Sequence, residues 1–231
     1  MKISIIHPTR GRKEKACSTA VHWLRYADNP YDIEYLISVD VNDTDKWYDE
    51  LRLIPGFQYR TIKGIPILKN NNRSAIDAIN NAAKVATGDL IMVVSDDFTC
   101  PNGWDTRLLK ALEGKSDFLV KTIDSLQPTL ITLPIMDRTY YNRFGYVYHP
   151  DYLHMFCDQE MTAVGHMLGK VINLNIPFEH LHYSAGKSEF DAVYAKNNAT
   201  WAQGESLFNE RLKTNFGIYN PVVPYSSIKW R

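Results

Sequence analysis

The sequence predicts an α/β fold in which a mostly parallel central sheet carries helices on both faces. Short apolar runs alternate with amphipathic helical patterns through the first hundred residues or so. The run at 90–94 is continuously apolar, as expected of a strand that is covered on both faces. Strand and helix follow one another four times, which favours parallel strands joined by right-handed crossovers.

The first half contains strand and helix patterns whose apolar spacing is clear. At 13–26, Ala16, Ala20 and Trp23 recur on one side of a helix. The helical pattern at 72–86 ends near Gly88, a residue type that favours helix ends. In chain order we expect a strand at 3–6, the helix at 13–26, a strand at 33–39, a short helix at 43–53, a strand at 56–61, the helix at 72–86 and a strand at 90–94.

The second half is less regular, so we expect mixed strand directions there. Its expected elements are a helix ending near 112, an apolar piece at 118–120, a strand at 130–133, an aromatic cluster at 140–146, a helix at 158–168, a strand at 171–174, further helix across 188–216 and an extended tail at 219–231. No Pro-, Gly- or Ser-rich linker divides the chain. We therefore expect one domain at 1–217, made of halves 1–104 and 105–217, followed by a tail at 218–231.

Composition limits the possible classes of partner. The 231 residues are 45% hydrophobic and 23% charged, which is ordinary for a globular protein. The 26 basic and 26 acidic side chains cancel, so no field of one sign indicates nucleic acid or an anionic membrane as a partner. The three cysteines lack CxxC or metal-type spacing, and no apolar segment resembles a signal peptide or a membrane span. We expect a soluble protein of the reduced cytoplasm.

Two adjacent carboxylates, Asp96 and Asp97, directly follow the buried strand at 90–94. Ligands of parallel sheets gather outside the carboxyl ends of the strands. Neighbouring carboxylates raise each other's pKa unless a positive charge lies between them, and hard oxygen ligands suit Mg²⁺ or Mn²⁺. The pair is therefore a candidate metal site. The alternative is a solvated turn that caps the following helix.

A basic turn, Pro8-Thr9-Arg10-Gly11-Arg12, follows the first strand. Guanidinium and backbone N–H donors ahead of a helix suit a diphosphate or a nucleobase. The turn lacks the glycines of dinucleotide-binding and P-loop motifs, which disfavours both. An ordinary basic turn without a ligand is the other interpretation.

Asp40 ends the second strand, where an acid in many nucleotide-binding sheets accepts from a ribose hydroxyl or a base N–H. The acids that follow it resemble the start of a calcium-binding EF-hand loop. No glycine stands at the sixth position, so calcium binding is not expected. Asp43 and Asp45 are expected to cap the next helix.

Two further motifs lie in the second half. Asp158 and Glu160 begin a helix, and their spacing of two residues directs them to different sides, so only one can serve a shared site. His180 and His182 share a face if their segment is extended, and either imidazole could complete a metal site with Asp97. Simple helix capping by Asp158 and surface roles for the two histidines are the alternatives.

Taken in order, these motifs resemble those of family 2 glycosyltransferases, which have the GT-A fold with a Rossmann-like sheet. The resemblance spans roughly residues 3–217. Its elements are Pro8-Thr9-x-x-Arg12, Asp40, the helix at 72–86 leading through Thr87-Gly88-Asp89 to Ser95-Asp96-Asp97, Asp158-x-Glu160 and His180-x-His182. The family motif after the fourth strand is DxD, and this chain departs from it by having Ser95 in place of the first acid.

The resemblance implies an inverting, divalent-metal-dependent glycosyltransferase with a donor such as UDP-sugar. Pro8, Thr9, Arg12, Asp40, Asn72 and Asp96 would then bind the donor, and Asp97 with His180 or His182 would hold Mn²⁺ or Mg²⁺. Asp158 corresponds to the catalytic base, with Glu160 as the second choice. The second half would form the acceptor pocket, and the acceptor could be a glycan, a lipid-linked sugar, a protein or a modified nucleobase.

Two other functions stay open at this point. A metal-dependent nucleotidyltransferase would also set carboxylates and a divalent ion against a nucleotide, although Gly11 alone is poor support for its usual glycine-rich loop. A non-catalytic nucleotide-sugar-binding module of the same fold is the second alternative. Ser95 and Cys157, which stand where the family usually has acids, motivate that alternative.

Overall fold

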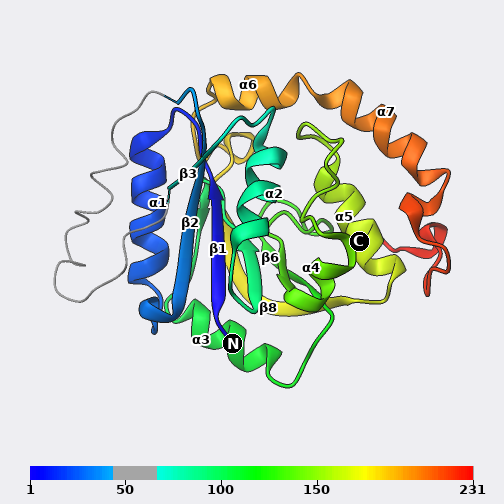
Figure 1. Cartoon of the computed structure of the whole chain (residues 1–231), viewed down its shortest axis with the longest axis horizontal. Helices are drawn as coiled ribbons and strands as arrows, with labels where there is room; N and C mark the ends of the chain where they lie inside the picture. Colours follow the sequence, from blue (N-terminus) through cyan, green and yellow to red (C-terminus); the bar gives the residue numbers. More distant parts are fainter. Residues whose placement is uncertain (44–66, 231) are drawn as a thin grey trace.

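A curled eight-stranded sheet runs through the centre of the computed structural model, which describes residues 1–43 and 67–230. The strand order is β3-β2-β1-β4-β7-β6-β8-β5. Helices cover both faces: α1 lies on one side of the sheet, and α2 and α5 lie on the other (Figure 1). The predicted α/β class with a mostly parallel sheet is confirmed.

The first four long strands are parallel to one another. They are β1 (Ile3–Pro8), β2 (Ile33–Asp40), β3 (Ile67–Asn70) and β4 (Leu90–Val93). Between and after them come α1 (Lys13–Arg25), the 3₁₀ turn η1 (Pro30–Asp32), α2 (Ala75–Val85), the short strand β5 (Phe98–Thr99) and α3 (Trp104–Leu112).

Strand β4 contributes alternate side chains to two separate cores. Leu90 and Met92 pack in the cluster that α1 and α3 cover, whereas Ile91 and Val93 pack in the cluster that α2 and α5 cover. Successive side chains of a strand point to opposite faces, so a strand between two helical layers must be apolar at every position. This is the physical reason for the continuous apolar run in the sequence.

The second half continues the sheet. Its elements are β6 (Leu119–Asp124), β7 (Ile135–Asp137), α4 (Arg138–Phe144), α5 (Cys157–Met167), β8 (Val171–His180), the 3₁₀ turn η3 (Tyr183–Ala185), α6 (Ala192–Asn198), α7 (Trp201–Leu212) and the 3₁₀ turns η4 (Asn215–Gly217) and η5 (Tyr225–Ser227). Strand β7 is antiparallel to both β4 and β6, and β8 is parallel to β6. The carboxyl ends of β1, β2, β4, β6 and β8 therefore lie at one edge of the sheet.

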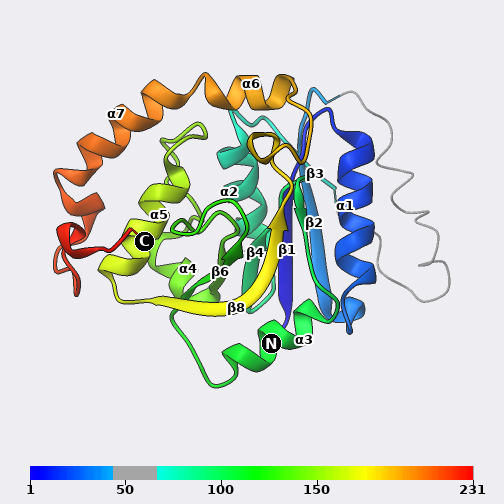
Figure 2. The same ribbon diagram turned by 180° about the vertical axis from the view of Figure 1, so that it is seen from behind.

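Helices α6 and α7 form an arm across this edge. In Figures 1 and 2, α6 passes over the carboxyl ends of the strands, and α7 continues above the second half. The chain then returns, and the C-terminus lies beside α5 in both views. Among the described residues, none of the helices combines the length and apolar character that a membrane span needs.

Several sequence-based boundaries were wrong or incomplete. The strand predicted at 130–133 is an irregular segment in which Ile131 and Leu133 are buried without a strand partner, and the strand occupies Ile135–Asp137. Residues in a buried loop are as apolar as those in a strand, so composition misplaced it. Strand β3 was not predicted, β8 is longer than expected, and the helix expected across 188–216 is divided into α6 and α7. The helix expected at 43–53 and the strand expected at 56–61 lie almost entirely outside the described residues.

One carboxylate joins three elements of the second half. Asp137 accepts hydrogen bonds from the backbone N–H groups of Asp117 at 2.6 Å, Phe118 at 3.0 Å and Tyr140 at 2.9 Å. It thereby caps α4 and fixes the chain that enters β6. The side chain is needed because these N–H groups are withdrawn from water and have few other acceptors.

Asp137→Ala should lower the free energy of unfolding by about 2–4 kcal/mol, because it removes a helix cap and leaves buried N–H groups without an acceptor. Chemical denaturation measures this loss. The control is Glu113→Ala, at an exposed position after α3, which should stay within about 0.5 kcal/mol of the parent. Equal stability of the two variants would show that Asp137 is dispensable.

Candidate active site

The carboxyl edge of the sheet gathers acidic and imidazole side chains from four strands. These are Asp40 at the end of β2, Asp96 and Asp97 after β4, Asp124 at the end of β6 and His180 at the end of β8. Because the strands run in the same direction at this edge, residues up to 140 positions apart in the chain become neighbours. The sequence-based prediction of a site here included all of them except Asp124.

Asp96 is almost completely buried and is held from three sides. Its carboxylate contacts Nε2 of His7 at 2.8 Å and accepts from Oγ1 of Thr9 at 3.2 Å, and its Oδ2 lies 3.8 Å from Nη1 of Arg12. His7 in turn contacts the hydroxyl of Tyr35 at 2.8 Å through Nδ1. Asp96 therefore fixes the turn after β1, and Thr9 and Arg12 lie beside it as expected. His7 is a partner that the sequence analysis missed.

Asp40 lies on the same edge, one strand further out. It accepts from Nδ2 of Asn72 at 3.0 Å and pairs with Arg10, while Asn72 also donates to the carbonyl of Val39 at 3.2 Å. Pro8 ends β1, and the N–H of Thr9 donates to the carbonyl of Ser38 at 3.0 Å. The residues predicted to bind a donor thus form two adjoining groups, one around Asp96 and one around Asp40.

Asp97 is engaged by three side chains. Its carboxylate accepts from the hydroxyl of Tyr194 at 2.9 Å and from Ser95, and it lies 3.5 Å from Nε2 of His180. Burial works to raise the pKa of Asp97, but the hydrogen bond and charge of His180, together with the two hydroxyl donors, hold that pKa well below its usual range. Asp97 is therefore ionised.

His180 bridges two carboxylates. Its Nδ1 lies 3.3 Å from Oδ2 of Asp124, which also accepts from Thr132 and from the N–H of Leu126 at 2.7 Å. Burial lowers the pKa of His180, yet the two carboxylates outweigh burial and raise it to about 9. The imidazole is thus a cation between Asp97 and Asp124. Asp124 ends an apolar strand as Asp40 does, and that repeated pattern is the signal that could have identified it.

The donor set at Asp97 fits a hard divalent cation. Asp97 offers oxygen and His180 offers Nε2 once its proton leaves, while Asp124 holds Nδ1 in the manner of a carboxylate that orients a metal-binding histidine. His182 is less well placed, because its Nδ1 contacts Ser184 Oγ at 2.8 Å. Within residues 1–43 and 67–230, no group of three or more His, Cys, Asp or Glu side chains is arranged as a complete metal site.

The arm covers this part of the edge. Asp191 accepts two hydrogen bonds from Arg12, at 2.9 Å from Nε and 2.7 Å from Nη2, and caps α6 through the N–H groups of Val193 and Tyr194. The guanidinium of Arg12 lies 4.6 Å from the ring centroid of Tyr194. Asp191 and Tyr194, which the sequence analysis missed, therefore occupy polar groups that a ligand at this edge would use.

Asp158 begins α5, and burial raises its pKa above the ordinary value. The charges of His180 and Asp124 act on it, which places it near the edge cluster. Glu160 turns away from Asp158: it accepts from Arg211 at 2.7 and 2.8 Å and from the hydroxyl of Tyr152 at 2.8 Å. The expectation that Glu160 could replace Asp158 is therefore corrected, since its carboxylate is committed to a buried ion pair.

The loop before Asp158 is held in a strained shape by α7. Phe156 has a left-handed backbone with φ of +70°, and its ring packs on Trp201 at 5.1 Å. Gly204 of α7 lies so close to Met155 that a Cβ there would be 2.3 Å from the Met155 carbonyl oxygen. Nδ1 of His154 is buried without a hydrogen-bond partner among the described residues, and burial lowers the pKa of His154 to about 4.

Two solved structures share the fold at low sequence identity. The mannosyltransferase PcManGT from Pyrobaculum calidifontis, in complex with GDP-Man and Mn²⁺, matches with a TM-score of 0.58 over 98% of this chain and 77% of its own, at 14% identity. Staphylococcal (S. aureus) TarS 1-349, in complex with UDP-GlcNAc, matches with a TM-score of 0.61 over 84% of this chain and 60% of its own, at 18% identity. No curated protein sequence matches the chain.

A family model identifies the chain more directly. The model for glycosyl transferase family 2 matches residues 4–169, which is more than half of the sequence and extends from β1 to the end of α5. The matched region includes Asp40, Asp96, Asp97, Asp124 and Asp158, and the solved neighbours have the GT-A fold that this family shares. The chain therefore belongs to glycosyl transferase family 2, and the protein is a glycosyltransferase.

Proposed function

We propose that this glycosyltransferase is an inverting, divalent-metal-dependent enzyme that moves a sugar from a UDP-sugar to an acceptor hydroxyl. The observation that carries the proposal is the convergence of Asp96, Asp97 and His180 at one strand edge, with the raised-pKa carboxyl of Asp158 beside them. A transferase needs these two kinds of acid: one that stays ionised to hold a cation and one that takes a proton.

The donor would lie along the edge from Asp40 to Asp97. Asp40 and Asn72 suit the base and ribose, because both present hydrogen-bonding groups at the ends of β2 and β3. Thr9, Arg12 and Asp96 suit the next part of the nucleotide, and Arg12 can exchange Asp191 for a diphosphate oxygen. The neighbours were solved with GDP-Man or UDP-GlcNAc, which supports a nucleotide-sugar donor. Uridine is our choice between the two bases.

Asp97 and His180 would hold Mn²⁺ or Mg²⁺, with His182 in reserve. Bound there, the ion would neutralise the negative charge that develops on the departing diphosphate. His180 must first lose its proton, since a protonated imidazole has no lone pair to offer at Nε2. Tyr194 must also release the Asp97 oxygen that it now occupies.

Asp158 would act as the general base. Its carboxylate takes the proton of the acceptor hydroxyl as the acceptor oxygen bonds to the anomeric carbon. The bond from that carbon to the diphosphate breaks, its electron pair leaves with the nucleoside diphosphate, and the anomeric centre inverts. A carboxyl whose pKa is raised by burial is a stronger base than an exposed one, which suits this role.

The two alternatives predict different products. A nucleotidyltransferase would release pyrophosphate, whereas a sugar transferase releases UDP. A non-catalytic module would bind the nucleotide sugar and release neither. A thermal-shift screen of nucleotide sugars with Mn²⁺ selects the donor, because a ligand of the folded state raises Tm, and product analysis then separates the three functions.

UDP should bind more tightly in the presence of Mn²⁺, and Asp97→Asn should abolish that gain. Isothermal titration with and without the ion measures both affinities. We expect a loss of at least about tenfold in the variant, since one charged ligand of the ion is removed. Asp151→Asn, at an exposed acid in the loop ahead of α5, is the matched control and should behave as the parent. The absence of UDP affinity in the parent would contradict the proposal.

Asp158→Asn should lower kcat by about 10²–10⁴-fold while UDP affinity stays unchanged, because the amide cannot accept the acceptor proton. Release of UDP from the donor in the presence of acceptor, together with titration of UDP, gives the two readouts. Normal sugar transfer by this variant would show that another group is the base.

Gly204→Ala should lower stability and kcat, although alanine is the better helix former by about 1 kcal/mol. The added Cβ would press on the Met155 carbonyl and move the loop that positions Asp158. Ser206→Ala, at an exposed position of the same helix, should cost nothing. Donor affinity should stay near the parent value, since Gly204 is remote from Asp40 and Asp96 in the fold. A stabilised, fully active Gly204→Ala enzyme would exclude the bracing role.

A further inference from the structure

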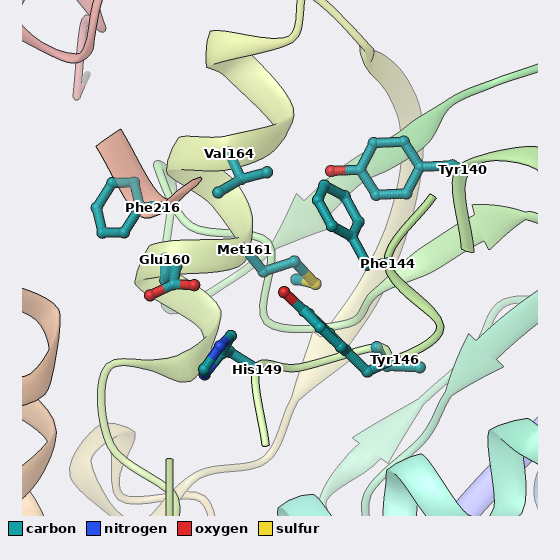
Figure 3. Close-up of a pocket in the computed structure, with 9 residues that line it drawn as sticks. Tyr140, Phe144, Tyr146, His149, Glu160, Met161, Val164 and Phe216 are labelled. Carbon is teal, nitrogen blue, oxygen red and sulfur yellow. The ribbon is translucent and has the colours of Figure 1, made fainter. Parts of the chain in front are cut away.

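A pocket lies on the face of α5 that is turned away from Asp158. It encloses about 340 Å³ of space, including its open mouth. The walls come from α4 and the loop after it, from α5 and from η4, and Figure 3 shows their side chains around the cavity. Met161 and Val164 of α5 form its floor. The donor residues around Asp40 and Asp96 take no part in it.

Aromatic rings form one wall of this pocket as a continuous series. Tyr140 and Phe144 have centroids 5.8 Å apart, Phe144 and Tyr146 stack at 5.6 Å, and Tyr146 meets His149 edge-on at 5.4 Å. Phe144 and Tyr146 are only half-buried, so part of their surface stays open to a ligand. Phe216 lines the pocket from η4.

Polar groups are set among these rings. The carboxylate of Glu160 is fixed by Arg211 and Tyr152 and still lines the pocket. Burial lowers the pKa of His149, so its ring is neutral and can both donate and accept. The hydroxyl of Tyr140, a residue only 2% exposed, has no hydrogen-bond partner among the described residues and turns toward Val164 in Figure 3. A buried hydroxyl without a partner is costly, so this one indicates a ligand with hydroxyl groups.

We propose that this pocket is a second carbohydrate-binding site, which holds a single pyranose ring without reacting with it. The C–H face of a sugar packs on aromatic rings, and its hydroxyls find partners in Glu160, His149 and Tyr140. A hydrocarbon chain fits less well, because it would cover the carboxylate and leave the Tyr140 hydroxyl without a hydrogen bond. The site goes beyond the proposed transfer reaction, since Asp158 and Glu160 leave α5 in different directions.

The pocket wall is already in place in the structure. Asn215 and Phe216 both have left-handed backbones, with φ of +50° and +54°. The Phe216 ring is held against Phe208 at 5.1 Å and Tyr225 at 6.0 Å. Strained residues persist only where their surroundings fix them, so η4 presents Phe216 in one position. A ligand therefore does not have to order this wall when it binds.

Methionine-methyl NMR tests the proposal on the full chain. Methyl glycosides of glucose, galactose and N-acetylglucosamine are titrated into protein labelled at its methionine methyl groups. At least one glycoside should shift the Met161 signal saturably and leave that of Met92, which lies in the other core, unchanged. UDP and Mn²⁺ are titrated separately, so failure of the donor site and failure of this pocket are read independently.

Variants decide whether the glycoside binds in the pocket. Tyr146→Ala should weaken binding by about tenfold through loss of a ring contact. Tyr140→Phe should weaken it by about fivefold without loss of stability, because it removes only the unpartnered hydroxyl. Tyr219→Ala, at a side chain that is 98% exposed, should have no effect.

Three results would overturn the proposal. They are an unchanged Met161 signal with all three glycosides, binding that survives Tyr146→Ala, and a saturable Met161 shift with 1-octanol that displaces the glycoside. The last result would make the pocket a site for an apolar ligand.

Discussion

The charged imidazole of His180 between Asp97 and Asp124 is the interaction on which the working edge of this protein depends. Three carboxylates, counting Asp158, meet at the ends of β4, β6 and α5, and they would repel one another without a cation. His180 supplies that cation from the end of β8. Because β7 reverses direction between β4 and β6, the partners of His180 end at the same edge. Strand order and charge balance thus explain each other.

The remaining contacts at this edge tie it to the arm. Arg12 binds Asp191 and lies beside the ring of Tyr194, whose hydroxyl reaches Asp97. The same polar atoms are the ones that a cation and a diphosphate would need. A donor must therefore exchange with side chains of the protein itself, and the free energy of its binding is the difference between two sets of similar contacts.

Sequence reasoning identified the parts of the fold and site that depend on local pattern. The apolar run before Asp96 and Asp97 required a strand buried on both faces, and Asp40 and His180 were recognised because they end or follow such runs. Asp124 follows the same rule yet was missed, since the irregular segment after it hid the strand. Asp191 and Tyr194 could not be predicted, because only the path of α6 across the sheet brings them to Arg12 and Asp97. The choice between Asp158 and Glu160 needed the position of Arg211.

The close approach of α7 to Met155 links the end of the chain to the chemistry at its centre. The left-handed backbone of Phe156 depends on Trp201 and on the absence of a side chain at Gly204. A chain truncated before α7 would keep the complete parallel half of the sheet and the residues around Asp40 and Asp96. It would lose the external splint of the loop that carries Asp158. Nucleotide recognition and proton abstraction are therefore separable by truncation, although they share a single continuous sheet.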